Sequence, residues 1–333
     1  MKSVLQVVMF LVLSFAAVAH AQTKVIKIDG SDTVYPITEA MSEEFQKDKK
    51  GSVNVTIGVS GTGGGFKKFC RGETDISDAS RPITKSEMDD CKAAQIKYFE
   101  IPIAFDATVV AVNAKNNWLN EISVADLKTI WQSAAQGKIK NWNQVNPKWP
   151  NAEIKLYGSG PGSGTFDFFT EAINGKAKES RGDYTASKDY NTLVKGIAGD
   201  QYALGYIPLA YFEENQKILK ALAILGGEKA PTKKAVLPSK KTVEDNTYFP
   251  LARPLFIYVS EAAAKKPEVN EFVKFYLAHA RSVVPAANYI ALPAKIYELG
   301  TEHYSKGKLG TVFGTGSNIG LKIDELMKKE TTF

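Results

Sequence analysis

The sequence predicts an α/β protein of two domains with mostly parallel sheets, and three observations lead to this prediction. Short β-rich runs alternate with amphipathic helical segments, which is typical of parallel sheets covered by helices. The chain has 333 residues, a length at which one core stops growing and two domains are expected. Hydrophobic residues make up 44% and charged residues 23%, an ordinary globular composition that excludes a disordered chain.

The first half of the chain shows the alternation most clearly. The run at 52–60 places Val53, Val55, Ile57 and Val59 on one face, as expected of a half-buried strand. Glycine-rich breaks separate this run from its neighbours. The other elements expected here are strands at 24–28, 74–80 and 97–113 and helices at 33–47, 65–70 and 124–132.

The second half contains fewer distinct elements. An amphipathic helix is expected at 267–280, and it begins with Pro267, a residue favoured at the first helical position. The remaining expected elements are strands at 153–158, 203–208 and 254–260 and a helix at 165–173. No later segment is long and apolar enough to span a membrane.

The first residues have the features of a secretory signal peptide. Lys2 precedes an apolar run that is too short to span a bilayer comfortably, and small residues follow it. Ala19-His20-Ala21 offers a cleavage site, and Ala17-Val18-Ala19 offers a second one. We therefore expect residues 1–21 to be removed and the mature protein to begin at Gln22 in an exported compartment.

The chain has two cysteines, Cys70 and Cys91. Exported compartments allow disulfides, so we expect these residues to form one. Closing the loop between Cys70 and Cys91 stabilises the fold by about 3 kcal/mol in the chain-entropy model. The alternative is a pair of buried free thiols.

Loops rich in glycine, serine and threonine recur where an expected strand runs into a helix. They are the segments GSDTVYP at 30–36, SGTGGGF at 60–66 and GSGPGSGTF at 158–166, with DASRPI at 78–83 in an equivalent place. Ligands of open α/β sheets bind beyond the carboxyl ends of the strands. Helix N-termini at that edge present free N–H groups and the positive end of the helix dipole. The loops therefore predict a site for a small oxyanion.

Other functional classes lack their motifs. The loop at 158–166 has no Walker A lysine, and the sequence holds neither a dinucleotide fingerprint in a convincing context nor a G-x-S-x-G elbow. After removal of the signal peptide only His279 and His303 remain as histidines, so a serine triad has little support. The net charge of +6 is mild and mixed, unlike that of a nucleic-acid-binding protein. We expect no catalytic residues, no metal and no cofactor.

The loops closely resemble those of the periplasmic phosphate-binding proteins, the PstS-type substrate-binding components of phosphate ABC transporters. The motifs that carry the resemblance lie at 30–37, 60–69, 73–83, 158–166, 199–215 and 248–259. They cover nearly the whole mature chain in the order of the family.

This resemblance implies a type II periplasmic-binding fold, in which two α/β lobes close over the anion around two hinge crossings. The crossings are expected near 104–108 and 249–254. Lobe I would then comprise 22–105 together with 252–333, and lobe II would comprise 106–251.

The resemblance also implies which residues contact phosphate. The residues that match the family's motifs are Ser31, Thr33, Val34, Ser60, Thr62, Ser80, Arg81, Ser163, Gly164 and Thr165. The register of the glycines leaves open whether Ser60 or Thr62 supplies the hydroxyl of the second loop.

Two positions depart from the better-known branch of the family, which has an aspartate after the third strand and an arginine ahead of Ser-Gly-Thr. This chain has Ser80 and Ser159 there, and Arg81 is the expected replacement cation. The alternative is that Arg81 pairs with Glu73 or Asp78 and holds the end of the strand.

The family's carboxylate accepts the proton that phosphate carries and sulfate lacks. In this chain the candidates for that role are Asp32 and Asp78, and either residue could instead cap a loop or a helix.

The function implied by the resemblance is that of a monomeric, non-enzymatic periplasmic receptor. It would bind inorganic phosphate and deliver it to an inner-membrane ABC permease. Two alternatives remain open: a receptor for another oxyanion such as sulfate or molybdate, and a secreted phosphatase that uses one of the loop serines.

Overall fold

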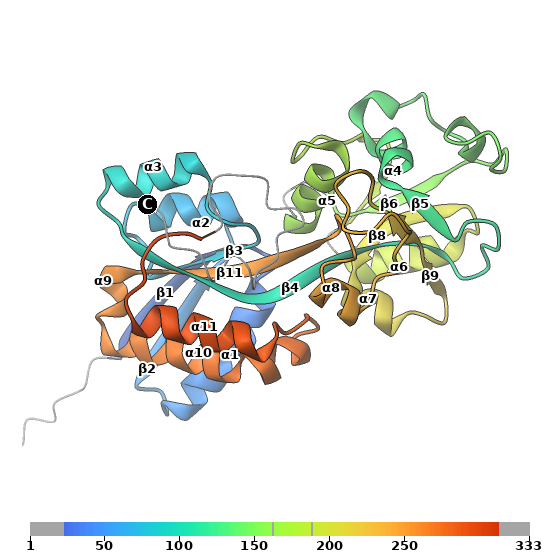
Figure 1. The fold of residues 1–333 in the computed structure, drawn as a ribbon. Helices are drawn as coiled ribbons and strands as arrows, with labels where there is room; N and C mark the ends of the chain where they lie inside the picture. Colours follow the sequence, from blue (N-terminus) through green and yellow to red (C-terminus); the bar gives the residue numbers. More distant parts are fainter. Residues whose placement is uncertain (1–22, 162, 188, 313–333) are drawn as a thin grey trace, which may run out of the picture.

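The computed structural model describes residues 23–312 apart from 162 and 188 (Figure 1). The predicted signal peptide, Gln22 and the final 21 residues of the predicted lobe I, 313–333, therefore lie outside the described residues. Within the described part, no helix combines the length and the apolar character that crossing a membrane requires.

One continuous set of paired strands passes through the described part of the chain. It has 9 strands in the order β2-β1-β3-β11-β4-β8-β6-β7, with β9 also paired to β4. The strands are β1 (Lys24–Gly30), β2 (Val53–Gly58), β3 (Ile76–Ala79), β4 (Tyr98–Asn113), β6 (Lys155–Gly158), β7 (Thr185–Ala186), β8 (Ala203–Pro208), β9 (Leu219–Ala221) and β11 (Ala252–Ser260). A separate parallel pair consists of β5 (Glu121–Ser123) and β10 (Ala223–Leu225).

Helices cover this sheet in two groups, which Figure 1 shows as two lobes. Lobe I, which carries β1 to β3, holds α1 (Tyr35–Asp48), α2 (Thr62–Phe69), α3 (Lys85–Ala93), α9 (Glu261–Ala264), α10 (Pro267–Ala286) and α11 (Ala294–Ser305). Lobe II, which carries β6 to β8, holds α4 (Val124–Trp131), α5 (Gly164–Asn174), α6 (Tyr190–Gly199), α7 (Leu209–Glu214) and α8 (Lys240–Glu244).

Two long strands, β4 and β11, run between the lobes (Figure 1). β4 pairs with β11 along Tyr98–Ala107 and then with β8 along Thr108–Val112. Every residue of both strands is buried. Their pairings are antiparallel, whereas β1–β2, β1–β3, β6–β7 and β6–β8 are parallel.

The predicted fold class is thus confirmed, since two α/β lobes with largely parallel sheets are joined by two crossings. The expected crossings, 104–108 and 249–254, fall on or beside β4 and the start of β11. The exact lobe boundaries at 105/106 and 251/252 remain a prediction, because the strands continue through them.

Several helices had no clear signal in the sequence, among them α3, α6 and α11. In α11 the buried residues are Ile296, Tyr297, Gly300, His303 and Tyr304. Their spacing is helical, but a glycine and a histidine occupy two of the inward positions. The apolar stripe that predicts a helix is therefore weak.

The expected disulfide is present between Cys70, which follows α2, and Cys91 in the last turn of α3. It ties the two helices together on the lobe I side of the cleft. α3 begins with a capping box in which Thr84 and Glu87 exchange hydrogen bonds.

Replacement of both cysteines by alanine should lower the free energy of unfolding by about 3 kcal/mol, because the unfolded chain regains the freedom that the bridge removes. Urea denaturation would measure this difference. The double variant should also be insensitive to reductant, whereas the parent protein should lose stability when it is reduced. A variant as stable as the oxidised parent would contradict this expectation.

Candidate anion-binding site

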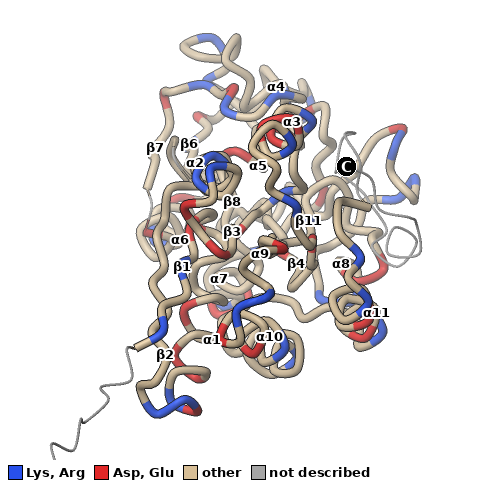
Figure 2. The backbone as a smooth tube through the Cα atoms, turned by 90° about the vertical axis from the view of Figure 1, so that its left-hand side faces the viewer, with Lys and Arg blue, Asp and Glu red and all other residues tan. Residues whose placement is uncertain are grey.

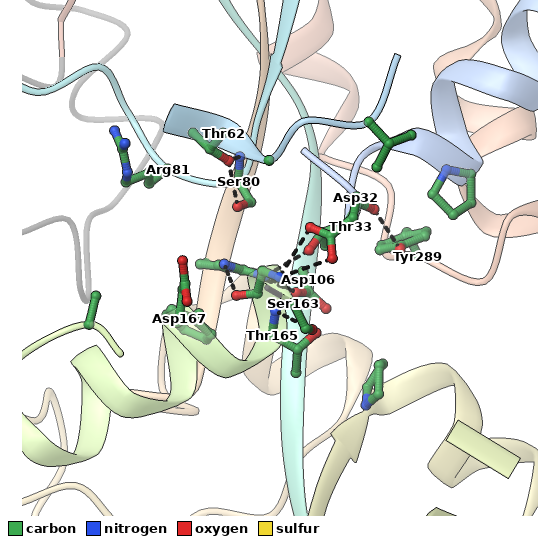
Figure 3. Close-up of a pocket in the computed structure, with 18 of the residues that line it drawn as sticks. Asp32, Thr33, Thr62, Ser80, Arg81, Asp106, Ser163, Thr165, Asp167 and Tyr289 are labelled. Carbon is green, nitrogen blue, oxygen red and sulfur yellow. Dashed lines mark hydrogen bonds and ion pairs between the residues drawn. The ribbon is translucent and has the colours of Figure 1, made fainter. Parts of the chain in front are cut away.

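A cavity of about 1200 Å³ lies between the lobes and is lined by residues of both. Lobe I contributes the loops that follow β1, β2 and β3, and lobe II contributes the loop before α5 (Figure 3). These are the four junction loops singled out in the sequence. Of the expected ligand contacts, the cavity walls include Thr33, Ser60, Thr62, Ser80, Arg81, Ser163, Gly164 and Thr165, together with Asp32.

Three helices, α1, α2 and α5, begin in the walls of this cavity. Residues of their first turns, such as Pro36, Gly63 and Gly164, line the walls. α2 starts after Gly61, whose φ of 77° favours glycine. A Cβ on Gly65 would lie 2.6 Å from the Cα of Gly30, so the glycines let α2 approach β1 closely. The arrangement presents three positive dipole ends to one space.

The loop after β1 meets the N-terminus of α5 across the cleft. The N–H of Gly164 donates to both carboxylate oxygens of Asp32 at 3.1 Å. Ser31 and Val34 lie behind the cavity wall, where Ser31 Oγ accepts from the N–H of Thr33 at 3.2 Å. The N–H of Val34 donates to the carbonyl of Ser31 at 3.2 Å. In this structure neither Ser31 nor Val34 is exposed to the cavity.

The hydroxyl of Ser60 is directed away from an incoming anion, because it donates to Asp29. Burial alone would raise the pKa of Asp29, but hydrogen bonds from Lys68 at 2.5 Å and from Ser60 outweigh it and lower the pKa. The carboxylate of Asp29 is therefore ionised at neutral pH and accepts the hydrogen bond from the Ser60 hydroxyl.

Thr62 and Ser80 face each other across the same part of the cavity. Their hydroxyl oxygens are 3.0 Å apart, and the N–H of Ser80 also donates to Thr62 Oγ1 at 3.1 Å. Only one of the two hydroxyl hydrogens can lie between the two oxygens. The other hydrogen is available to a ligand.

Arg81 lines the cavity, but its guanidinium is already paired. Both Nη atoms donate to the two carboxylate oxygens of Glu87 at 2.8 Å. The alternative partners expected from the sequence, Glu73 and Asp78, are therefore wrong. Glu87 is closer in space because it occupies the third position of α3, directly after the Arg81 loop. Burial would lower the pKa of Arg81, and Glu87 more than compensates, so the pKa is raised.

A second arginine in the cavity wall, Arg253 at the start of β11, was not predicted. It is only 6% exposed, and its Nε and Nη2 donate to Asp106 Oδ2 at 3.1 and 2.9 Å. Its guanidinium also lies 4.5 Å from the ring centroid of Phe168. The available signal was Arg253 itself, which directly precedes the apolar run PLFIYV. An arginine beside such a run is expected to be buried, and a buried cation must be paired.

Arg253 connects the elements that form the site. It donates to Thr33 Oγ1 of lobe I at 3.3 Å and to the carbonyl of Gly164 in lobe II at 3.1 Å. Its ion-pair partner Asp106 lies on β4, the other crossing strand. The pair therefore fixes both walls of the cavity at the point where the chain passes between lobes.

The Ser-Gly-Thr segment forms the lobe II wall. Ser163 caps α5 by accepting from the N–H of Thr165 at 3.2 Å, and the hydroxyl of Thr165 lies 2.8 Å from that of Tyr190. Ser159 is fully buried behind this wall, and its carbonyl accepts from Tyr184 and Tyr206 at 2.8 Å. Ser159 does not line the cavity.

Of the two carboxylates expected to sense the ligand's proton, Asp32 lies in the cavity wall and Asp78 does not. Asp78 is 1% exposed, and within the described part of the chain its Oδ1 has no hydrogen-bond partner. Burial raises the pKa of Asp78 to about 8. Below about pH 8 Asp78 is thus a neutral acid inside lobe I.

Metal-ligating side chains are not grouped in the described residues. Between 23 and 312, with the two gaps noted above, no three His, Cys, Asp or Glu side chains lie close enough together to hold an ion. The chemistry of the cavity is that of hydroxyls, backbone N–H groups and paired charges.

The chain is similar to known proteins over most of its length. A family model described as a PBP superfamily domain matches residues 17–279. The chain is 49% identical over 325 residues to Protein SphX of Synechocystis, covering 97% of this chain and 95% of that protein. It is 40% identical over 284 residues to the Phosphate-binding protein PstS of Staphylococcus saprophyticus, covering 84% and 83%.

A solved structure shows the same similarity. It is described as a possible phosphate binding protein from Planctomyces limnophilus and shares 44% sequence identity with this chain. The superposition has a TM-score of 0.75 and covers 85% of this chain and 98% of that protein.

Replacement of Asp78 by asparagine should make stability less dependent on pH. An aspartate in an unfolded chain has a pKa of about 4, so between that value and about 8 only the folded protein keeps the Asp78 proton. The free energy of unfolding should therefore fall as the pH rises through this interval. The asparagine variant, which resembles the protonated acid, should gain relative to the parent over the same interval.

Urea denaturation at a series of pH values would measure this difference. Asp90→Asn, on the exposed surface of α3, is the matched control. A difference between Asp78→Asn and the parent that did not change with pH would show that Asp78 titrates normally.

Proposed function

The chain belongs to the PBP superfamily together with the SphX and PstS proteins, and from this premise we propose that it is a receptor for inorganic phosphate. The family identified from the loop motifs is thereby confirmed. The receptor would take up phosphate outside the cytoplasm and deliver it to an inner-membrane ABC permease.

One observation carries this proposal: three helix N-termini, the Thr62–Ser80 hydroxyl pair and Arg253 line one cavity between two lobes. A tetrahedral dianion can accept from donors on every side, and helix N-termini supply such donors with a favourable dipole. An arginine adds charge-assisted hydrogen bonds in a fixed geometry. The proposed contacts are Thr33, Thr62, Ser80, Arg81, Ser163, Gly164, Thr165 and Arg253.

Ser60 has a supporting role in this proposal. Its hydroxyl hydrogen is engaged by Asp29, so the donor of the second loop is Thr62. Ser31 and Val34 would support the first loop from behind. Ligand contacts on both lobes would favour the closed arrangement.

The cavity favours binding over hydrolysis. A phosphatase needs a base beside its nucleophile. The described residues that line the cavity include no histidine, and the carboxylates of Asp32 and Asp106 already accept from Gly164 and Arg253. Ser163, one of the loop serines, is buried and accepts from the N–H of Thr165 as a helix cap.

Export and a monomeric state complete the proposal. The signal-peptide features of 1–21 support secretion, and N-terminal sequencing of the exported protein should begin at Gln22. Basic and acidic residues are interspersed along the backbone tube in Figure 2, which supports a soluble receptor and not a nucleic-acid-binding protein. Sedimentation should give the mass of one chain.

Calorimetry on protein stripped of bound ligand should detect one phosphate per chain, and a chromogenic phosphate ester should not be turned over. Phosphate at a hundred times its dissociation constant should stabilise the fold by about 2.7 kcal/mol. Absence of binding to phosphate, with tight binding to sulfate or molybdate, would assign the receptor to another oxyanion. Turnover of the ester would show that the protein is an enzyme and not a receptor.

The two arginines should differ in their effect on phosphate affinity. Arg253→Lys should weaken binding by about 2 kcal/mol or more, because one ammonium cannot maintain the fork that joins Asp106, Thr33 and Gly164. Arg81→Lys should cost about 1 kcal/mol, because Glu87 already occupies its fork. Melting temperatures would confirm that both variants are folded. A larger loss in Arg81→Lys would make Arg81 the principal cation.

A further inference from the structure

Tyr258, on β11, lies directly behind the loop that carries Ser80 and Arg81. It is fully buried, whereas Ser80, Arg81 and Pro82 line the cavity. Its hydroxyl accepts from the backbone N–H of Ile83 at 2.9 Å. Ile83 is itself buried and directly follows the cavity-lining residues. Tyr258 therefore holds the loop at the point where it leaves the cavity wall (Figure 3 shows the side chains of Ser80 and Arg81 on this wall).

The same hydroxyl is oriented by a carboxyl group. It donates to Glu100 Oε2 at 2.6 Å, and the strand register makes Tyr258 and Glu100 direct neighbours on β11 and β4. Burial and the nearby Glu100 raise the pKa of Tyr258 well above its ordinary value, so the hydroxyl keeps its hydrogen. Because that single hydrogen is directed to Glu100, the oxygen faces Ile83 as an acceptor.

Glu100 also binds the last described residues of the chain. Its Oε2 accepts from the hydroxyl of Thr311 at 2.6 Å, and its Oε1 accepts from the N–H of Val312 at 2.9 Å. A chain of hydrogen bonds therefore runs from residues 311–312 through Glu100 and Tyr258 to the cavity loop. Buried networks of this kind make their surroundings rigid.

A second set of contacts joins Tyr258 to the side chain of Arg81. The ring of Tyr258 packs edge-on against Phe66 of α2, with 4.8 Å between the ring centroids. The guanidinium carbon of Arg81 lies 5.7 Å from the centroid of the same Phe66 ring. Tyr258 is thus connected to Arg81 through the backbone of Ile83 and through the Phe66 ring.

We infer that Tyr258 is a positioning residue for the anion site and acts through Arg81. This inference rests on the proposed phosphate-binding function. Glu87 pairs with the guanidinium alone, whereas Tyr258 fixes the backbone from which the Arg81 side chain extends. The arginine is thereby in place before a ligand arrives, which lowers the cost of ordering it on binding.

Calorimetry on ligand-stripped protein should show that Tyr258→Phe binds phosphate about 5-fold more weakly than the parent, because the buried N–H of Ile83 loses its acceptor and the loop shifts. Tyr297→Phe is the matched control. The Tyr297 hydroxyl also accepts from a backbone N–H, that of Leu292 at 3.1 Å, and donates to the carbonyl of Ile103 at 2.7 Å. None of these three residues lines the cavity, so the control should keep the phosphate affinity of the parent.

A double-mutant cycle separates the positioning of Arg81 from a general loss of stability. In an Arg81→Ala background, Tyr258→Phe should change the phosphate affinity by less than about 2-fold, because the side chain that it positions is absent. Melting temperatures would establish that each variant is folded. Unchanged affinity in Tyr258→Phe would overturn the inference, and so would losses that are additive in the cycle.

Glu100→Gln is a second variant, which decides the matter where Tyr258→Phe does not fold. The glutamine amide can donate to the Tyr258 oxygen, so the direction of the hydroxyl is no longer fixed. Phosphate affinity should fall here too, and again not additively with Arg81→Ala; an affinity equal to that of the parent would count against the inference. A parent that binds sulfate or molybdate in place of phosphate would refute the proposed function, and the same cycle with that anion would still decide the role of Tyr258.

Discussion

The buried ion pair between Arg253 and Asp106 is the interaction on which the rest of the site depends. Its members lie on the two strands that cross between the lobes, and the arginine also binds one group in each wall of the cavity. Removing one partner would leave an uncompensated charge in a buried position, which costs about 3–5 kcal/mol. The pair therefore maintains the geometry of the crossing and the charge of the cavity together.

Carboxylates behind the cavity wall hold polar groups of the site in fixed positions. Asp29 accepts a hydrogen bond from Ser60, and Glu87 accepts from both Nη atoms of Arg81. Each such contact fixes a polar group before a ligand arrives, which reduces the cost of ordering it on binding. The positive charges of the site lie beside negative ones. An anion in the cavity would therefore interact with oriented dipoles more than with a net positive charge.

Much of this arrangement could be predicted from the sequence, and the exceptions have physical reasons. The junction loops were recognisable because glycine and hydroxyl residues at strand ends carry a local signal. Arg253 could not be recognised in this way, because its role depends on Asp106. That residue is distant in the sequence and becomes adjacent only through the pairing of β4 with β11. Arg81 lines the cavity, but its partner Glu87 could not be predicted, because it depends on the position of α3, a helix with a weak apolar pattern.

The continuity of β4 limits how this molecule can be divided. The described chain begins in β1 and ends at Val312, whose N–H donates to Glu100 on β4, so both ends belong to lobe I and lobe II is an insertion within it. Excision of lobe II would cut β4 between its two sets of partners and expose an unpaired edge on each fragment. The lobes consequently share one strand pair, and an exchange of lobes between relatives would have to carry that strand pair intact.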